Sequence, residues 1–125
     1  MGAFCPLVRS VCADMPFFGD IPGILDATII RYPQRELQDF AESMTLGRER
    51  FLAVAAYLDT GFVAAHCRVP TLVSLGEKDP ACRPHSVRRI YEALPGEKNL
   101  VEYPGGHDWD PGMVAENADW FARTL

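Results

Sequence analysis

The sequence predicts an α/β fold, in which helices flank a parallel sheet, for one domain of 125 residues. Three short apolar runs, at residues 8–15, 70–76 and 99–103, have the length and composition of buried strands. Segments with helical spacing of apolar residues separate these runs, and such alternation is typical of βαβ units. Near-continuous apolar strands favour a parallel sheet because both faces of such a sheet are covered.

The first strand and the first helix follow each other closely. The run at 8–15 is apolar with β-branched residues, and Pro16 ends it. Asp20 suits the beginning of a helix over 20–31. The apolar positions of this helix, near helical spacing, are Ile21, Leu25 and Thr28 or Ile29.

Two further helices are predicted from amphipathic patterns. Residues 48–58 are rich in alanine and leucine, and three side chains share one face. These are Phe51, Ala55 and Leu58. Residues 84–94 carry apolar side chains at i, i+3, i+4 and i+7 and have proline in the first turn. These apolar positions are Val87, Ile90, Tyr91 and Leu94.

The chain closes with the strand at 99–103, a glycine-rich loop and a last helix. Asp110 is a suitable cap for this helix, and Pro111 is a suitable first residue. The predicted buried face of the helix consists of Val114, Ala118, Phe121 and Leu125.

Composition excludes several classes of function. The net charge is −5, with basic residues scattered along the chain, so no basic stripe is available to bind nucleic acid. The N-terminal residues lack the pattern of a signal peptide, and the longest apolar runs are far shorter than the roughly 20 residues that span a bilayer. We therefore expect no membrane association and a cytoplasmic protein.

The cysteines do not have the spacing of a metal site or of a disulfide framework. Cys5, Cys12, Cys67 and Cys82 include no C-x-x-C pair. Four reduced, mostly buried thiols are the preferred interpretation. A metal site built from Cys82, His85 and His107 is a weaker alternative.

Two titratable residues follow neighbouring strands of the predicted sheet. Asp79 comes after the strand at 70–76, and His107 after the strand at 99–103. Ligands of open parallel sheets bind at the carboxyl ends of the strands, so the two loops are expected to lie side by side. A carboxylate bound to one imidazole nitrogen fixes the tautomer and leaves the other nitrogen as a base for a hydroxyl. Each residue alone could simply shape a loop, but the pair in this order predicts catalysis.

The other two histidines have no comparable setting. His66 stands beside a cysteine ahead of a strand, and we interpret it as structural. His85 begins a predicted helix, where exposure to solvent is the simplest interpretation.

Three segments resemble the acetyl xylan esterase and cephalosporin-C deacetylase family of α/β-hydrolases. They are ADMPFFGD, YLDTGFVAAHCRVPTLVSLGEKDPACRP and YPGGHDWD, and the resemblance extends over nearly the whole chain. The middle segment is the most specific. Its matching positions are Tyr57, Asp59, Phe62, Ala64, Pro70, Ser74, Gly76, Asp79, Cys82 and Pro84.

The resemblance implies a site and a reaction. The resemblance implies that Asp79 is the acid and His107 the base of a catalytic triad. It also implies that Phe17 or Phe18 lines the wall of an acyl pocket. Packing in the core is the alternative role for either ring. The family removes acetyl groups from small acetylated sugars and related esters, without a metal or an organic cofactor. The sequence departs from the family pattern after Cys82, where Arg83-Pro84-His85 stands, and at Asp108.

The chain contains no G-x-S-x-G motif, which carries the nucleophilic serine in α/β-hydrolases. We therefore expect residues 1–125 to be one partial α/β-hydrolase domain that corresponds to the C-terminal part of an esterase. The alternative is a truncated, inactive α/β module that associates through an unpaired sheet edge. Members of the family also tend to form hexamers, so the resemblance implies that copies of this chain can associate as a homo-oligomer.

Overall fold

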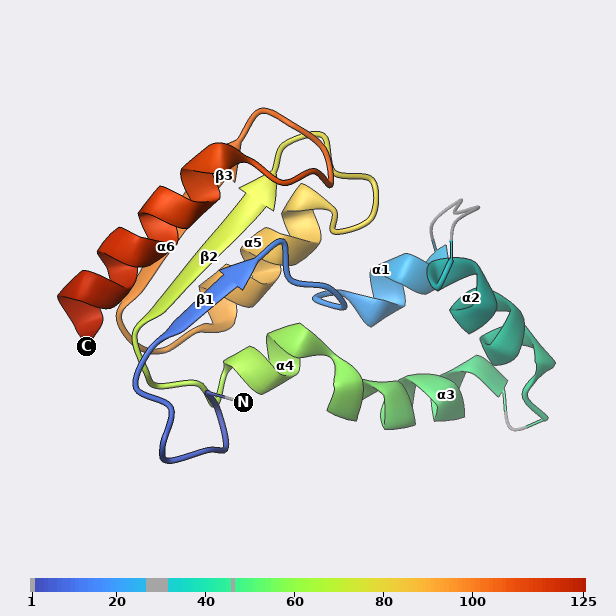
Figure 1. Ribbon diagram of the computed structural model, residues 1–125. Helices are drawn as coiled ribbons and strands as arrows, with labels where there is room; N and C mark the ends of the chain where they lie inside the picture. The colour runs from blue at the N-terminus through green and yellow to red at the C-terminus, as the bar shows by residue number, and fades with distance from the viewer. Residues whose placement is uncertain (1, 27–31, 46) are drawn as a thin grey trace.

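Three strands of the computed structural model form a parallel sheet in the order β1-β2-β3. The structure describes residues 2–26, 32–45 and 47–125. The strands are β1 (Val11–Asp14), β2 (Thr71–Gly76) and β3 (Lys98–Tyr103). Helices lie on both sides of the sheet, so the predicted α/β class is confirmed (Figure 1).

The central strand, β2, is buried along its whole length. It pairs with β1 from Val11 opposite Thr71, and with β3 from Thr71 opposite Lys98. The strand begins immediately after Pro70, which has no N–H to donate to a ladder. Burial on both faces explains the apolar sequence of this segment.

Two long helices cover the sheet. Helix α5 (Pro84–Ala93) packs against β2 and against the short helix α4 (Thr60–Ala64), and α6 (Pro111–Thr124) packs against β1 and β2 (Figure 1). The predicted core face of α5 is confirmed, because Val87, Ile90 and Leu94 are buried and the half-buried Tyr91 packs against the same core. The Asp110 cap of α6 is also confirmed, since its carboxylate accepts a hydrogen bond of 2.8 Å from the Gly112 amide.

A second, smaller apolar cluster joins the helices that follow β1. These helices are α1 (Ile21–Asp26), α2 (Gln34–Ser43) and α3 (Gly47–Ala55), with the 3₁₀ turn η1 (Ala56–Leu58) after them. The cluster includes Ile21, Ala41, Phe51 and Ala55. The predicted end of the first helix, with Thr28 and Ile29, lies outside the described residues.

Three details of the predicted elements are wrong, and each has a physical cause. The first strand was expected over 8–15 but β1 has four residues. It ends before Met15, whose φ of 47° is left-handed and cannot continue a strand. Leu58 was expected on the buried face of α3, yet its side chain is exposed because the helix tightens into η1.

The buried face of α6 is the third error. Met113 and Trp120 face the sheet, whereas Val114, Ala118 and Leu125 are exposed and Phe121 is half-buried. The large indole of Trp120 removes more apolar area from water than the smaller side chains of the predicted face.

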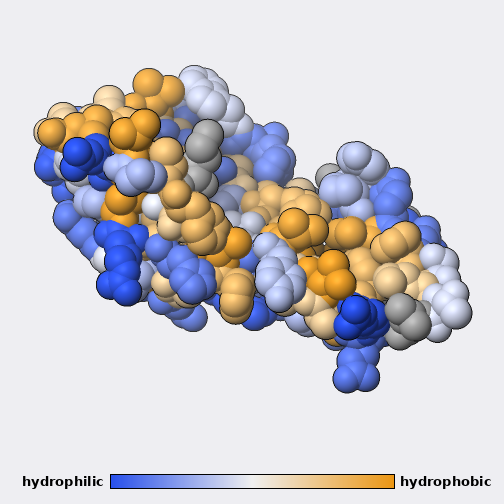
Figure 2. All heavy atoms as spheres, turned by 90° about the horizontal axis from the view of Figure 1, so that it is seen from below, coloured by the Kyte–Doolittle hydropathy of each residue, from blue (hydrophilic) through white to orange (hydrophobic). Residues whose placement is uncertain are grey.

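Several apolar side chains remain on the surface. Figure 2 shows apolar residues gathered on the underside of the molecule, where α3 and α4 lie. The large apolar side chains exposed on these elements and on η1 are Val54, Tyr57, Leu58 and Phe62.

The core around β2 predicts a clear effect of one substitution. Leu75 has no exposed surface, and Leu75→Ala is expected to lower the free energy of unfolding by about 3 kcal/mol through lost burial and a cavity. Leu7 is 85% exposed, so Leu7→Ala should change stability by less than about 0.5 kcal/mol. Urea denaturation of the two variants measures both values, and equal effects would contradict the described core.

Candidate active site

The loops after β2 and β3 lie side by side at the carboxyl end of the sheet (Figure 1). Main-chain hydrogen bonds join them: the Glu77 amide donates to the Tyr103 carbonyl at 2.8 Å, and the Lys78 amide donates to the Gly105 carbonyl at 2.9 Å. Gly76 is required at this crossing, because a Cβ there would lie 2.2 Å from the Gly106 carbonyl oxygen. The predicted juxtaposition of the two loops is therefore confirmed.

The first of these loops holds the Asp79 carboxylate in one orientation. Its side chain has no exposed surface. Oδ1 accepts hydrogen bonds from the amides of Ala81 at 2.7 Å and Cys82 at 2.8 Å. These two donors compensate part of the cost of burying a charge and leave Oδ2 for another partner.

The partner of Oδ2 is His107. Its Nδ1 lies 2.7 Å from Asp79 Oδ2, within hydrogen-bond reach. The imidazole is 53% exposed, so the pair has a buried carboxylate at one end and a solvent-accessible ring at the other. With Nδ1 held as the donor, Nε2 of the neutral ring is an acceptor for a proton.

Phe17 and Phe18 lie between β1 and α1. Their ring centroids are 4.1 Å apart, and both side chains are half-buried. Phe17 packs against the core of the sheet and Phe18 against the helical cluster. Both therefore contribute to packing, and their assignment to an acyl pocket stays a prediction.

A second buried carboxylate, that of Asp59, lies beside the residue that holds this aromatic segment, and the sequence pattern alone did not reveal its role. Asp59 accepts hydrogen bonds from the amides of Ile21, the first residue of α1, and Gly61, in the first turn of α4. The next residue, Thr60, donates from its amide to the Phe18 carbonyl at 2.8 Å and from Oγ1 to the Phe17 carbonyl at 2.6 Å. An aspartate followed by Thr-Gly is a helix-capping signal that could have indicated α4.

Cys82 is the third chemically active side chain beside the pair. The thiol is buried, and burial, together with the nearby Asp79 carboxylate, raises its pKa to about 12. One ligand atom each of Asp79, Cys82 and His107 lies within 4.8 Å of the others, so this group could hold a metal ion. His85, which the alternative metal site required, is not part of the group; its Nε2 lies 3.6 Å from Asp20 Oδ2.

The raised pKa predicts an unreactive cysteine. At pH 8 only about one Cys82 thiol in ten thousand is deprotonated, and the thiolate is the nucleophile. We expect iodoacetamide to alkylate the half-buried Cys5 well before Cys82 in the folded protein, and both at similar rates in denaturant. Peptide mass spectrometry over time measures the two rates, and fast native labelling of Cys82 would contradict its described burial.

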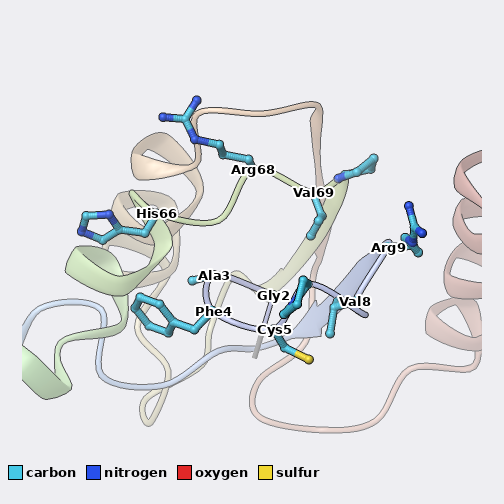
Figure 3. Close-up of a pocket in the computed structure, with 11 residues that line it drawn as sticks. Gly2, Ala3, Phe4, Cys5, Val8, Arg9, His66, Arg68 and Val69 are labelled. Atoms are coloured by element: carbon cyan, nitrogen blue, oxygen red, sulfur yellow. The ribbon is translucent and has the colours of Figure 1, made fainter.

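A separate cavity lies away from this pair. It has a volume of about 530 Å³, between the N-terminal loop and the segment that precedes β2. Figure 3 shows Ala3, Phe4 and Cys5 on this loop, across from His66 and Val69. His66 is exposed and contacts the ring of Phe62 at 5.7 Å between centroids. This cavity is at the amino end of β2, away from the strand ends where ligands of parallel sheets bind.

Within the part of the chain that the structure describes, none of the helices has both the length and the apolar character needed to cross a membrane.

Solved structures with the same fold include two acetyl xylan esterases. Acetyl xylan esterase 1 from Thermoanaerobacterium sp. JW/SL YS485 is 23% identical, with a TM-score of 0.87 over 99% of this chain and 40% of that chain. The acetyl xylan esterase from Paenibacillus sp. R4 is 17% identical, with a TM-score of 0.90 and the same shares of each chain. The chain thus spans about 40% of the length of these proteins.

More distant structures share the architecture. Puromycin hydrolase has a TM-score of 0.69 and 22% identity, over 98% of this chain and 19% of that chain. The three parallel strands and their helices are part of an α/β-hydrolase fold, as predicted. No curated protein matches the sequence. The model of the acetyl xylan esterase family, AXE1, matches residues 1–123, and the chain therefore belongs to the acetyl xylan esterase family.

Proposed function

We propose that the chain supplies the acid and the base of a carboxylic ester hydrolase that removes acetyl groups from small acetylated sugars or related esters. The observation that carries this proposal is the 2.7 Å contact between Asp79 Oδ2 and His107 Nδ1 at the carboxyl end of the sheet. The family to which the chain belongs supports the ester class, and the two acetyl xylan esterases among its structural relatives support acetylated xylan as a substrate type.

The reaction divides the work between the two residues. His107 takes the proton of a serine hydroxyl through Nε2 as that hydroxyl attacks the acetyl carbonyl, and it later protonates the leaving alcohol. Asp79 keeps the ring in the tautomer with a proton on Nδ1 and stabilises the imidazolium that forms. The serine and the oxyanion donors come from outside these 125 residues, because the chain has no G-x-S-x-G.

The aromatic segment is proposed to limit the acyl group. Phe17 and Phe18 follow the carboxyl end of β1, and Thr60 fixes the main chain of both. Half-buried rings held in this way form a rigid apolar wall, which favours a small acetyl group over a longer chain. The mechanism needs no metal ion or organic cofactor.

The test compares the purified chain with a joined enzyme, in which a segment bearing G-x-S-x-G is fused ahead of the 125 residues. Acetate release from a small activated acetyl ester is measured for both. The proposal requires turnover from the joined enzyme that depends on its serine. A folded joined enzyme without such turnover would refute it.

A second candidate function is an inactive module that associates with another chain. Among the described residues β1 pairs only with β2, so its other edge is open for pairing, although this edge is short and ends at the exposed Asp14. Exposed apolar side chains on α3 and α4 also favour association (Figure 2). Light scattering tests this candidate: a monomer at high concentration would argue against it.

A further inference from the structure

A buried thiol that ester hydrolysis does not use lies beside the Asp79–His107 pair. Cys82 is 3% exposed, and Asp79 is equally buried. Their ligand atoms and one ring nitrogen of His107 all lie within 4.8 Å of one another. Sulfur, nitrogen and carboxylate oxygen are the three ligand types that Zn²⁺ takes in proteins.

The cluster is close to the geometry of a zinc site. Tetrahedral Zn–S and Zn–N bonds of standard length place sulfur and nitrogen about 3.5 Å apart. The widest separation among the three ligand atoms, at most 4.8 Å, would have to close by no more than about 1.3 Å. Oδ2 of Asp79 and Nδ1 of His107, now 2.7 Å apart, would have to open by about 0.6 Å. His107 can make this movement, because it follows Gly105 and Gly106 and its ring is half exposed.

The carboxylate is already oriented as a metal ligand. Two amides hold Oδ1 of Asp79, which leaves Oδ2 as the ligand atom. Such secondary hydrogen bonds typically orient the ligands of protein metal sites. The partly exposed imidazole leaves one side of the cluster open for entry of the ion and for a water molecule as the fourth ligand.

We propose that Asp79, Cys82 and His107 bind a thiophilic divalent cation of the Zn²⁺ class, which separates the carboxylate from the imidazole and so inactivates the pair. Bonds form from the ion to Sγ of Cys82, Oδ2 of Asp79 and Nδ1 of His107. The S–H bond breaks and its proton goes to solvent, while the imidazole proton moves from Nδ1 to Nε2 through water. The site changes from a net charge of −1 to zero, which neutralises the buried charge of Asp79.

Inhibition by the ion follows from the same geometry. With Nδ1 on the metal and a proton on Nε2, the ring has no nitrogen left to accept the proton of a serine. This regulatory consequence rests on the proposed function, whereas metal binding itself does not. The two are therefore separable by experiment.

Binding is tested with the 125-residue chain, using Zn²⁺ and Co²⁺ as probes. We expect one ion per chain by calorimetry, and with Co²⁺ a thiolate-to-metal charge-transfer band in the near ultraviolet. Cys82→Ser and His107→Ala should each weaken Zn²⁺ binding at least about tenfold, and Cys82→Ser should remove the band. His107→Ala changes an exposed side chain, so it remains informative if Cys82→Ser fails to fold.

Cys67 provides the matched control. It is also a buried free cysteine, and its Sγ lies 3.7 Å from Thr71 Oγ1, in the core of the sheet. Cys67→Ser should leave the Co²⁺ band and the affinity unchanged. A band that survives Cys82→Ser, or no Co²⁺ band with the wild-type chain, would overturn the proposal. In the joined enzyme, Zn²⁺ should inhibit turnover, and Cys82→Ser should raise the inhibitory concentration by the same factor as the loss of affinity.

Discussion

His107→Ala is expected to abolish hydrolysis by the joined enzyme, with a loss in kcat on the order of 10⁶-fold. The reason is that Nε2 of this ring is the only proposed acceptor for the serine proton, and its Nδ1 is already bound to Asp79 at 2.7 Å. Without the ring, the hydroxyl attacks as a neutral and weak nucleophile. Acetate release at saturating substrate measures kcat, and the exposed position of the ring predicts that the variant folds normally.

The other two histidines serve as controls for this substitution. His66 contacts Phe62 at the far end of β2, and His85 lies near Asp20 at the beginning of α5. His66→Ala and His85→Ala should retain kcat within a few-fold of the joined enzyme. Turnover that survives His107→Ala, or that is lost in His66→Ala, would show that the reaction uses a different site.

The site could be predicted from the sequence to the extent that it depends on topology. Asp79 and His107 follow consecutive strands of a parallel sheet, and the carboxyl ends of such strands meet at one edge. The main-chain donors that hold Oδ1 of Asp79 could not be predicted in the same way. Every residue except proline has an amide, so Ala81 and Cys82 carry no signal of this role in their side chains.

Elements that bury apolar side chains could be predicted from the sequence, whereas an element that buries polar side chains could not. Strand β2 and helix α5 bury continuous or periodic apolar residues, and their positions were predicted closely. Helix α2 was missed because two of its buried residues are glutamines. Gln34 Nε2 donates to the Ala81 carbonyl, and Gln38 Nε2 donates to the Ile24 carbonyl. Hydrophobic periodicity cannot detect a helix whose buried face is satisfied by hydrogen bonds.

Long-range packing also decided details that no local pattern contains. Which face of α6 is buried depends on how Trp120 fits against the sheet. Val114 has the helical spacing expected of a buried residue, yet its side chain is exposed. The backbone is left-handed at Met15, with a φ of 47°, and at Phe18, with a φ of 60°. Such conformations are uncommon outside glycine, and the hydrogen bonds from Thr60 help to hold the segment.

Asp79→Asn is expected to lower kcat of the joined enzyme by about 10⁴-fold while the site keeps its shape. The amide oxygen of asparagine can still accept hydrogen bonds from Ala81 and Cys82, which bind Oδ1 in the wild type. The amide nitrogen then replaces Oδ2 opposite His107. Because that nitrogen is a donor, Nδ1 of the ring must become the acceptor and the proton must move to Nε2.

The expected loss therefore comes from the wrong tautomer and from the missing negative charge beside the imidazolium, rather than from substrate binding. KM should change little, since Asp79 is buried and does not reach solvent. Asp110→Asn is the matched control, because asparagine caps a helix as well as aspartate and Asp110 holds only the beginning of α6. A joined enzyme that retains full kcat with Asp79→Asn would rule out the carboxylate as the residue that orients His107, even if His107 itself proves essential.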